Sequence, residues 1–331
     1  MYIYKATGNN TLLKEELSVI EEGNLVKVKT TAYMPSQLDI EYFEGSEKVN
    51  YPHSLGTIAI GVVSDDREEY GLKRGTKVII NPYVSEINDK AALPNNVKIN
   101  GVELEGLFSD LVYIEPERLT PFPEDVKEDQ AIFTSKIAIA LSVLNSFKCE
   151  KGDYVAILGG SALCNIIAQL AMYFQMIPII IDSFESNLVI MKDSGIYYTI
   201  NSTLEVPVDK VKEFTGGRMA EHTIIDIASY ETGSYLFQLS RMGGDCTVIC
   251  ENKYSKKLEV DLDFVSRRQL KVSGISNGAS EFDSAINILA QKIINFNGLV
   301  EKKIGKEDAE EYLKKIQQNN VHIPTSIIEM L

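Results

Sequence analysis

The half of the chain that follows residue 150 repeats one pattern, in which a short apolar run is followed by a turn and an amphipathic segment. Such runs, separated by helix-forming segments, predict parallel strands joined by helical crossovers. A parallel sheet has helices on both faces. We therefore expect an α/β, doubly wound parallel-sheet domain. Its predicted strands are YVAILG (154–159), IPIIID (177–182), YYTIN (197–201), HTIIDIA (222–228), DCTVIC (245–250) and QLKVSGI (269–275).

The chain up to about residue 120 has a different texture, with short alternating runs and frequent turn residues. Strands are predicted at 25–33, 58–65 and 75–85, which together favour a β-rich, barrel-like unit. Helices are predicted from residue 128 onward, and again near the C-terminus. The helical segments are 128–147, 281–298 and 306–320.

Charge and composition exclude several classes of partner. The 331 residues carry a formal net charge of -14, which repels nucleic acids and anionic membrane surfaces. No apolar run approaches the roughly 20 residues that span a bilayer, and the N-terminus lacks a basic-then-apolar signal pattern. The four cysteines form no CxxC pair, which fits reduced structural thiols. We expect a cytoplasmic protein that acts on a small molecule.

The segment AILGGSALCNIIAQLA (156–171) is typical of a strand, turn and helix that bind a dinucleotide. A helix that begins after such a turn directs its N-terminus at the ligand and attracts a phosphate. The expected contacts come from Gly159, Gly160, Ser161, Ala162 and Leu163.

The three-glycine pattern of such loops is incomplete here. Ser161 adds a Cβ where the backbone should approach the pyrophosphate, although its hydroxyl could donate to a phosphate. Cys164 replaces the glycine that permits close packing of helix and strand. The alternative is a doubly wound domain that has lost nucleotide binding and keeps the loop as a turn.

The next predicted strand ends at Asp182, 23 residues after Gly159. A carboxylate at this point accepts hydrogen bonds from the adenosine ribose, and it repels the 2'-phosphate of NADP. Asp182, with Ser183 beside it, therefore favours NAD(H) over NADP(H).

Several phrases in order give the chain a family resemblance. KGDYVAILGG, IIIDSFESNLVIMKDSGIYYTIN, FTGGRMAEHTIIDIA and LSRMGGDCTVIC follow a β-rich half at characteristic spacing. The chain resembles the medium-chain dehydrogenase/reductase family. The resemblance implies a GroES-like catalytic domain at 1–124, completed by 276–331, and a Rossmann dinucleotide-binding domain at 125–275. It also implies that the nicotinamide meets the substrate in a cleft between the domains.

The resemblance also indicates where a catalytic zinc would be held. The family's cysteine, histidine and glutamate positions fall on Ser36, Thr57 and Ile58, and a further acidic position falls on Ser135. These side chains do not replace thiolate and imidazole ligands. The region 81–106, which would carry four structural cysteines, has none. We expect no zinc.

Without zinc, a hydroxyl or amide must stabilise the reacting carbonyl or alkoxide oxygen. The resemblance places Ser36, Thr57 and Tyr33 at or beside the mouth of the cleft, so these are the predicted catalytic residues. Each also has a structural alternative: Tyr33 as an anchor at a strand end, Ser36 in a turn after Pro35, and Thr57 as an ordinary strand residue.

Asp39 occupies an acidic position common in the family, where helix capping or a salt bridge is more plausible than acid–base catalysis. The resemblance further places Ser229, Cys250 and Glu251 at strand ends that approach the cofactor.

The predicted function is zinc-independent hydride transfer between NAD(H) and a small alcohol, carbonyl or conjugated carbonyl compound. One alternative is a non-catalytic descendant used for ligand sensing or assembly. Another is an NADPH-dependent quinone or enoyl reductase, which would favour basic residues after the second strand, where DSFESN has none. The last strand of the cofactor domain, near 269–275, is expected to be a sheet edge with unpaired backbone groups. Because such an edge can pair with a second copy, as the resemblance also implies, we expect a homodimer or homotetramer.

Overall fold

The computed structural model describes residues 1–17, 23–46, 49–85, 97–123, 125–226, 234–250, 260–319 and 325–330. The described residues form two compact units. The first contains 1–135 together with 300–319 and 325–330, and the second contains 136–299. The boundaries that we predicted, after 124 and after 275, therefore lie earlier in the chain than those of the compact units, and residues 276–299 group with the second unit.

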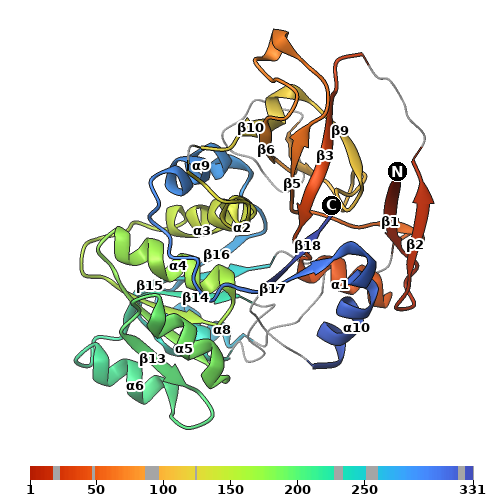
Figure 1. Ribbon diagram of the computed structural model, residues 1–331. Helices are drawn as coiled ribbons and strands as arrows, with labels where there is room; N and C mark the ends of the chain where they lie inside the picture. Colours follow the sequence, from red (N-terminus) through yellow and green to blue (C-terminus); the bar gives the residue numbers. More distant parts are fainter. Residues whose placement is uncertain are drawn as a thin grey trace. The chain divides into compact units, whose positions relative to one another are not determined.

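The first unit is rich in β-strands, as the sequence predicted, and most of its strand pairs are antiparallel. Its main sheet has the order β10-β6-β5-β3-β18-β17, with β9 paired to β3 (Figure 1). Two smaller sheets, β2-β1-β4 and β7-β8, lie in the same unit. The strands are β1 (Tyr2–Ala6), β2 (Leu12–Glu16), β3 (Val26–Tyr33), β4 (His53–Ser54), β5 (Ala59–Val63), β6 (Lys77–Ile80), β7 (Tyr83–Ser85), β8 (Val97–Ile99), β9 (Leu111–Ile114), β10 (Leu119–Pro121), β17 (Val300–Gly305) and β18 (Thr325–Glu329). The helices are α1 (Gln37–Glu44), α2 (Glu128–Ala131) and α10 (Ala309–Asn319), with short 3-10 turns at Glu68–Tyr70, Pro116–Arg118 and Lys306–Asp308.

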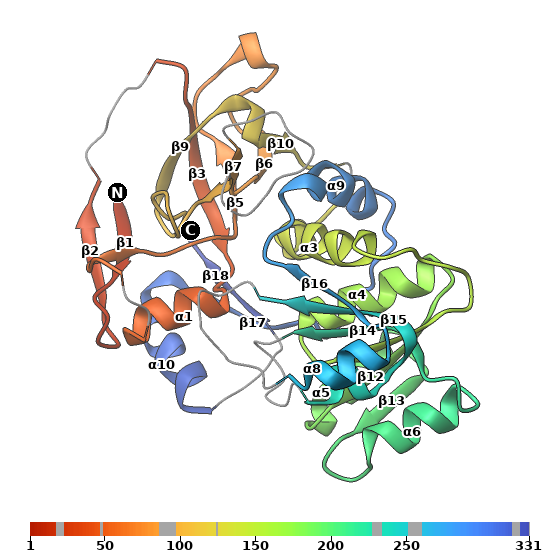
Figure 2. The ribbon, with the colours of Figure 1, turned by 180° about the vertical axis from the view of Figure 1, so that it is seen from behind.

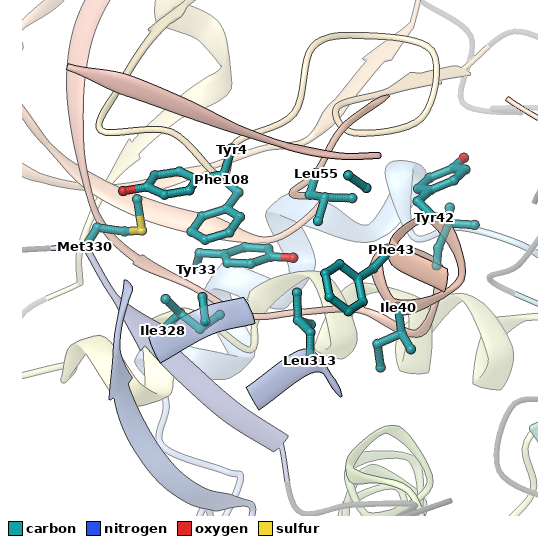
Figure 3. Packing of buried hydrophobic residues seen from close by; sticks show 13 residues of the cluster. Tyr4, Tyr33, Ile40, Tyr42, Phe43, Leu55, Phe108, Leu313, Ile328 and Met330 are labelled. Atoms are coloured by element: carbon teal, nitrogen blue, oxygen red, sulfur yellow. The ribbon is translucent and has the colours of Figure 1, made fainter. Parts of the chain in front are cut away.

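An aromatic stack forms the centre of one core in this unit (Figure 3). The Phe108 ring lies between the rings of Tyr4 and Tyr33, with both centroid distances 4.4 Å. Phe43 from α1 and Leu313 from α10 belong to the same buried cluster. The cluster therefore joins the N-terminal strands to the C-terminal helix, and it fixes the position of α1.

The second unit contains the predicted parallel sheet. Its six strands have the order β13-β12-β11-β14-β15-β16, and every neighbouring pair is parallel. This order is that of a Rossmann fold, which places the ends of the first strands at a topological switch point. The strands are β11 (Tyr154–Leu158), β12 (Ile177–Asp182), β13 (Tyr198–Asn201), β14 (Ala220–Asp226), β15 (Ser240–Ile249) and β16 (Lys271–Ile275). The helices are α3 (Thr134–Asn145), which begins in the first unit, α4 (Ala162–Tyr173), α5 (Glu185–Asp193), α6 (Pro207–Phe214), α7 (Ser234–Gln238), α8 (Leu262–Arg267) and α9 (Phe282–Ala290), with a 3-10 turn at Ala279–Glu281.

Helices cover both faces of this sheet and pack on its apolar side chains. Ala156 and Ile179 share a buried cluster with Val211 of α6 and Leu236 of α7, against which Phe264 of α8 packs. Figures 1 and 2 show α4 on one face of the sheet and α8 on the other. The strands are apolar on both faces because both are buried.

Two predicted helices differ from the observed ones. The segment predicted at 281–298 forms α9 only as far as Ala290, because Lys292 adopts a left-handed backbone with φ of 56°. The segment predicted at 128–147 is divided into α2 and α3. Within the described residues, no helix combines the length and the apolar character that a membrane span needs.

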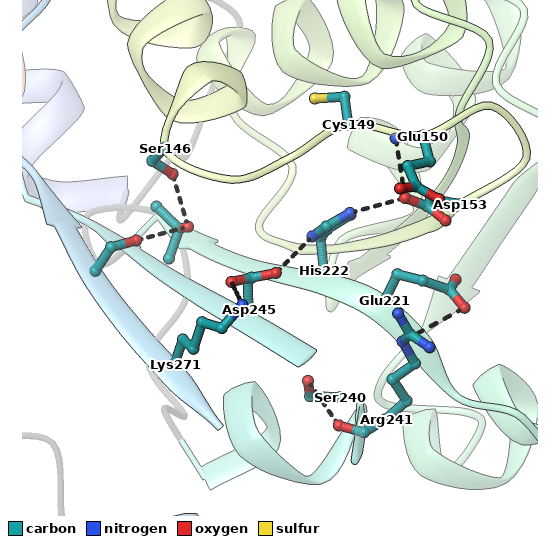
Figure 4. A network of polar contacts seen from close by, with 12 residues as sticks. Ser146, Cys149, Glu150, Asp153, Glu221, His222, Ser240, Arg241, Asp245 and Lys271 are labelled. Atoms are coloured by element: carbon teal, nitrogen blue, oxygen red, sulfur yellow. Dashed lines mark hydrogen bonds and ion pairs between the residues drawn. The ribbon is translucent and has the colours of Figure 1, made fainter. Parts of the chain in front are cut away.

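A polar network lies beside the first residues of β14 and β16 and the middle of β15 (Figure 4). The buried His222 ring stacks on Phe147 at 4.0 Å, and its Nε2 and Nδ1 atoms lie 3.1 Å from Asp153 and 3.4 Å from Asp245. Lys271 of β16 in turn lies 3.5 Å from Asp245. The network joins three strands at the amino edge, so it belongs to the scaffold and not to the loop edge described next.

Candidate functional site

The loop between β11 and α4 has the geometry of a nucleotide-binding turn. Gly159 has a φ of 125°, a conformation that favours glycine, and its N–H donates to the Ile181 carbonyl of β12 at 2.9 Å. Ser161 is the N-cap of α4, and its Oγ accepts from the Cys164 N–H at 3.0 Å. The loop therefore starts the helix directly at the carboxyl edge of the sheet.

The Ser161 hydroxyl donates its hydrogen bond to another side chain of the protein. Its proton is donated to Asp226 Oδ2 at 2.8 Å, and Cys164 Sγ lies 3.9 Å from the same oxygen. Asp226 is the buried last residue of β14. A serine hydroxyl has one proton, so the bond to a phosphate that the sequence allowed is replaced here by a bond to Asp226.

The N-terminus of α4 still offers backbone donors. The N–H groups of Ala162 and Leu163 lie in the first turn of α4, where a backbone N–H has no carbonyl acceptor within the helix. Together with the positive end of the helix dipole, they suit a phosphate group.

Asp182 lies where the sequence placed it, at the carboxyl end of β12. Its Oδ1 accepts from the Phe184 N–H at 2.7 Å and from Asn187 Nδ2 at 3.2 Å. A Cβ built on Gly160 would lie 2.7 Å from Asp182 Oδ2, so only glycine allows the loop and this carboxylate to come so close. The neighbouring Ser183 is exposed.

Sequence reasoning missed two residues here, Asp226 and Asn187. The strand order places β14 beside β11, so the last residue of β14 had to lie near the loop. Asn187 comes five residues after Asp182, in the first turn of α5, which directs its side chain back toward the strand end.

In the first unit, Ser36 and Asp39 form a buried capping box at the start of α1. Asp39 Oδ2 accepts from the Ser36 N–H at 2.8 Å and from Ser36 Oγ at 2.6 Å, while Asp39 Oδ1 accepts from the Gly56 N–H at 2.8 Å. Burial raises the pKa of the Asp39 carboxyl, and these hydrogen bonds oppose the rise. The capping role expected for Asp39 is thus present.

The three predicted catalytic residues have different surroundings. Tyr33 has no exposed surface and belongs to the aromatic stack, where burial raises the pKa of its phenol well above the usual value. Ser36 is buried and bonded to Asp39. Thr57 is half-buried, and its hydroxyl has no hydrogen bond to any described residue.

The other predicted residues are placed in part. Ile58 and Ser135 are buried, Cys250 is half-buried directly after β15, and Ser229 and Glu251 lie outside the described residues. All four cysteines are free thiols. In the part of the chain that the structure describes, no three His, Cys, Asp or Glu residues are grouped so that they could hold a metal ion.

Known proteins resemble this chain along nearly its whole length. Residues 21–124 match the alcohol dehydrogenase GroES-like domain. An uncharacterized zinc-type alcohol dehydrogenase-like protein of Haemophilus influenzae is 24% identical over 321 residues, which cover 94% of this chain and 93% of the relative.

Two solved structures share the fold. The Escherichia coli alcohol dehydrogenase RspB, in complex with NADH, superposes with a TM-score of 0.85 at 18% identity, covering 99% of each chain. The 2R,3R-butanediol dehydrogenase of Bacillus subtilis superposes with a TM-score of 0.86 at 16% identity, also covering 99% of each chain. The chain has a GroES-like unit followed by a Rossmann-type parallel sheet. The domain match and the relative support the predicted medium-chain dehydrogenase/reductase family, and the solved structures confirm the predicted fold.

Proposed function

We propose that the protein is a zinc-independent oxidoreductase that transfers a hydride between NAD(H) and a small alcohol, carbonyl or conjugated carbonyl compound. The observation that carries this proposal is the junction of Gly160, Asp182 and the N-terminus of α4. It brings a strand-end carboxylate and a helix N-terminus together, as a dinucleotide requires. The NADH complex of the structural neighbour RspB supports the same choice of cofactor.

The residues present fit a dinucleotide. The N–H groups of Ala162 and Leu163 would hold the pyrophosphate, and Asp182 would accept from the adenosine ribose hydroxyls. A carboxylate has about four lone-pair sites, so the bonds from Phe184 and Asn187 do not by themselves prevent this. The bound cofactor supplies or accepts the hydride, while the chain binds and orients the reactants.

The preference for NAD(H) follows from the charge of Asp182. This buried carboxylate would repel a 2'-phosphate, and the exposed residues that follow it, Ser183 to Ser186, include no cation to attract one. We favour NAD(H) over NADP(H) on this ground, although a structural neighbour from Sinorhizobium meliloti binds NADP.

The substrate oxygen needs a hydrogen-bond donor in the absence of zinc. Among the three predicted residues, Thr57 is the best candidate because its hydroxyl is not committed to a described residue. Ser36 would act only by sharing the proton that it donates to Asp39, and Tyr33 supports the core.

Zinc independence rests on the chemistry of the side chains at the family's ligand positions. Ser36 is a helix cap, Thr57 is an alcohol, and Ile58 is a buried hydrocarbon, so none offers a thiolate or imidazole. We therefore assign no metal to the reaction, although the Haemophilus influenzae relative has a zinc-type name.

The assembly that we propose is a homodimer or homotetramer formed through β16. This strand ends the sheet, and its Val272 side chain is 53% exposed, while Leu262 of the neighbouring α8 is 74% exposed. An edge strand with exposed apolar side chains favours pairing with a second copy.

A non-catalytic descendant remains the second candidate, and one observation favours it. The hydroxyl of Ser161 is bonded to Asp226, so a second buried carboxylate lies beside the loop that would hold the pyrophosphate. Such a charge weakens the binding of an anion.

A thermal-shift titration separates the two candidates. The oxidoreductase predicts that NADH raises the melting temperature, that NADPH raises it less, and that zinc with or without a chelator leaves it unchanged. A melting temperature that is insensitive to both nucleotides favours the non-catalytic descendant, and a rise with zinc alone contradicts the metal-free assignment.

A further inference from the structure

Asn187 is tied to the carboxylate of Asp182. Its Nδ2 donates to Asp182 Oδ1 at 3.2 Å, and the same oxygen accepts from the Phe184 N–H at 2.7 Å. Two donors on one oxygen fix the rotation of the carboxylate about its Cβ–Cγ bond. The second oxygen, Oδ2, is thereby held against the nucleotide loop.

Gly160 packs against both side chains from the loop between β11 and α4. A Cβ at Gly160 would lie 2.7 Å from Asp182 Oδ2, 2.7 Å from Asn187 Cβ and 2.8 Å from Asn187 Nδ2. These distances are too short for any side chain larger than hydrogen, so the three residues form one packed unit. Asp182 and Asn187 are 1% and 2% exposed, and neither can change rotamer without moving the other.

We propose that Asn187 is a positioning residue for nucleotide selection: it holds the Asp182 carboxylate against Gly160 in the orientation that accepts a ribose diol. This inference rests on the proposed function, since it assigns the determinant of NADH over NADPH within that site. Asn187 acts through Asp182 and needs no contact with the nucleotide.

Removal of the amide donor should affect the two nucleotides differently. In Asn187→Leu, the Asp182 carboxylate loses the donor from Asn187, so its orientation toward the ribose diol is less well defined. NADH should then bind about tenfold more weakly, which corresponds to about 1.4 kcal/mol. NADPH, whose 2'-phosphate gains nothing from Asp182, should change by less than about twofold.

A second variant replaces the donor by a titratable group. In Asn187→Asp, a carboxyl would lie in contact with that of Asp182, and such a pair retains one shared proton at low pH. That proton restores a donor to Asp182, so NADH affinity should approach the parent value at low pH and fall as pH rises. The nearby Glu185 accepts from Asn201 at 3.0 Å, a bond that lowers the pKa of Glu185, and it lies 3.5 Å from Lys192.

Calorimetry with NADH and NADPH on the parent, both variants and Ser186→Ala tests the proposal. Ser186 is exposed in the same helical turn, and its variant should behave as the parent. A selective loss of NADH affinity in Asn187→Leu, with a pH-dependent affinity in Asn187→Asp, supports the proposal. Equal losses for both nucleotides, no loss at all, or a pH-independent Asn187→Asp overturns it. A parent that binds neither nucleotide overturns the proposed function itself.

Discussion

Replacement of Ser161 by glycine tests how the loop is held. Ser161→Gly restores the residue that the three-glycine pattern favours, but it removes the N-cap oxygen that accepts from the Cys164 N–H and the hydroxyl that donates to Asp226. The sequence alone allowed the change to strengthen or weaken nucleotide binding. The structure indicates that the change also lowers the free energy of unfolding of the protein without nucleotide.

The magnitude follows from the two bonds. Exchange of a serine N-cap for glycine costs only a few tenths of a kcal/mol. A hydrogen bond to a charged group contributes about 1.5–3 kcal/mol. Ser161→Gly should therefore lower the free energy of unfolding by about 2 kcal/mol, most of it through the lost donor to Asp226.

Urea denaturation of four proteins measures this directly. The parent, Ser161→Gly, Asp226→Asn and the double variant form a cycle, in which the two residues should show a coupling of about 1–2 kcal/mol. The reasoning is refuted if Ser161→Gly changes the free energy of unfolding by less than about 0.5 kcal/mol, or if the two changes are additive. In that case the bond between Ser161 and Asp226 contributes nothing to the loop.

Three further outcomes are expected. Purified protein should contain no stoichiometric zinc by elemental analysis, and about one tightly held zinc per chain would contradict the assignment made at Ser36 and Thr57. Burial raises the pKa of Asp39, so its contribution to stability is present at pH values below the unfolded pKa near 3.8 and is lost as pH rises through the folded pKa. The parent should thus lose stability relative to Asp39→Asn as pH rises, whereas a constant difference in urea midpoint between pH 4 and 8 would refute this sign. Light scattering should give a dimer or tetramer mass, and a Val272→Lys variant at the β16 edge should shift it toward the monomer; a parent that is monomeric at all concentrations rules this out.

The order of the elements was predictable because it depends on local patterns. The six parallel strands were predicted from apolar runs and turns, and all six overlap with the observed strands. Of these, β14 begins two residues and β15 five residues earlier than expected. The end of α9 was missed because the left-handed backbone at Lys292 leaves no mark in the apolar spacing.

Contacts between distant residues were less predictable. Asp226 lies 65 residues after Ser161, and only the strand order brings the two together. The burial of Tyr33 follows from stacking on Phe108, which comes from a different part of the chain. Asp182 was predicted because it directly follows five apolar residues of a predicted strand. The contacts that orient its carboxylate were not predicted, because they depend on the packing of Gly160 and Asn187.

The most direct test of the central claim is the affinity of the parent and of Asp182→Ser for NADH and NADPH, measured by calorimetry. The account predicts that the parent binds NADH more tightly than NADPH, and that Asp182→Ser narrows this gap by weakening NADH. Equal affinities in the parent would contradict the role of Asp182. The absence of binding by either nucleotide would contradict the oxidoreductase and favour the non-catalytic descendant.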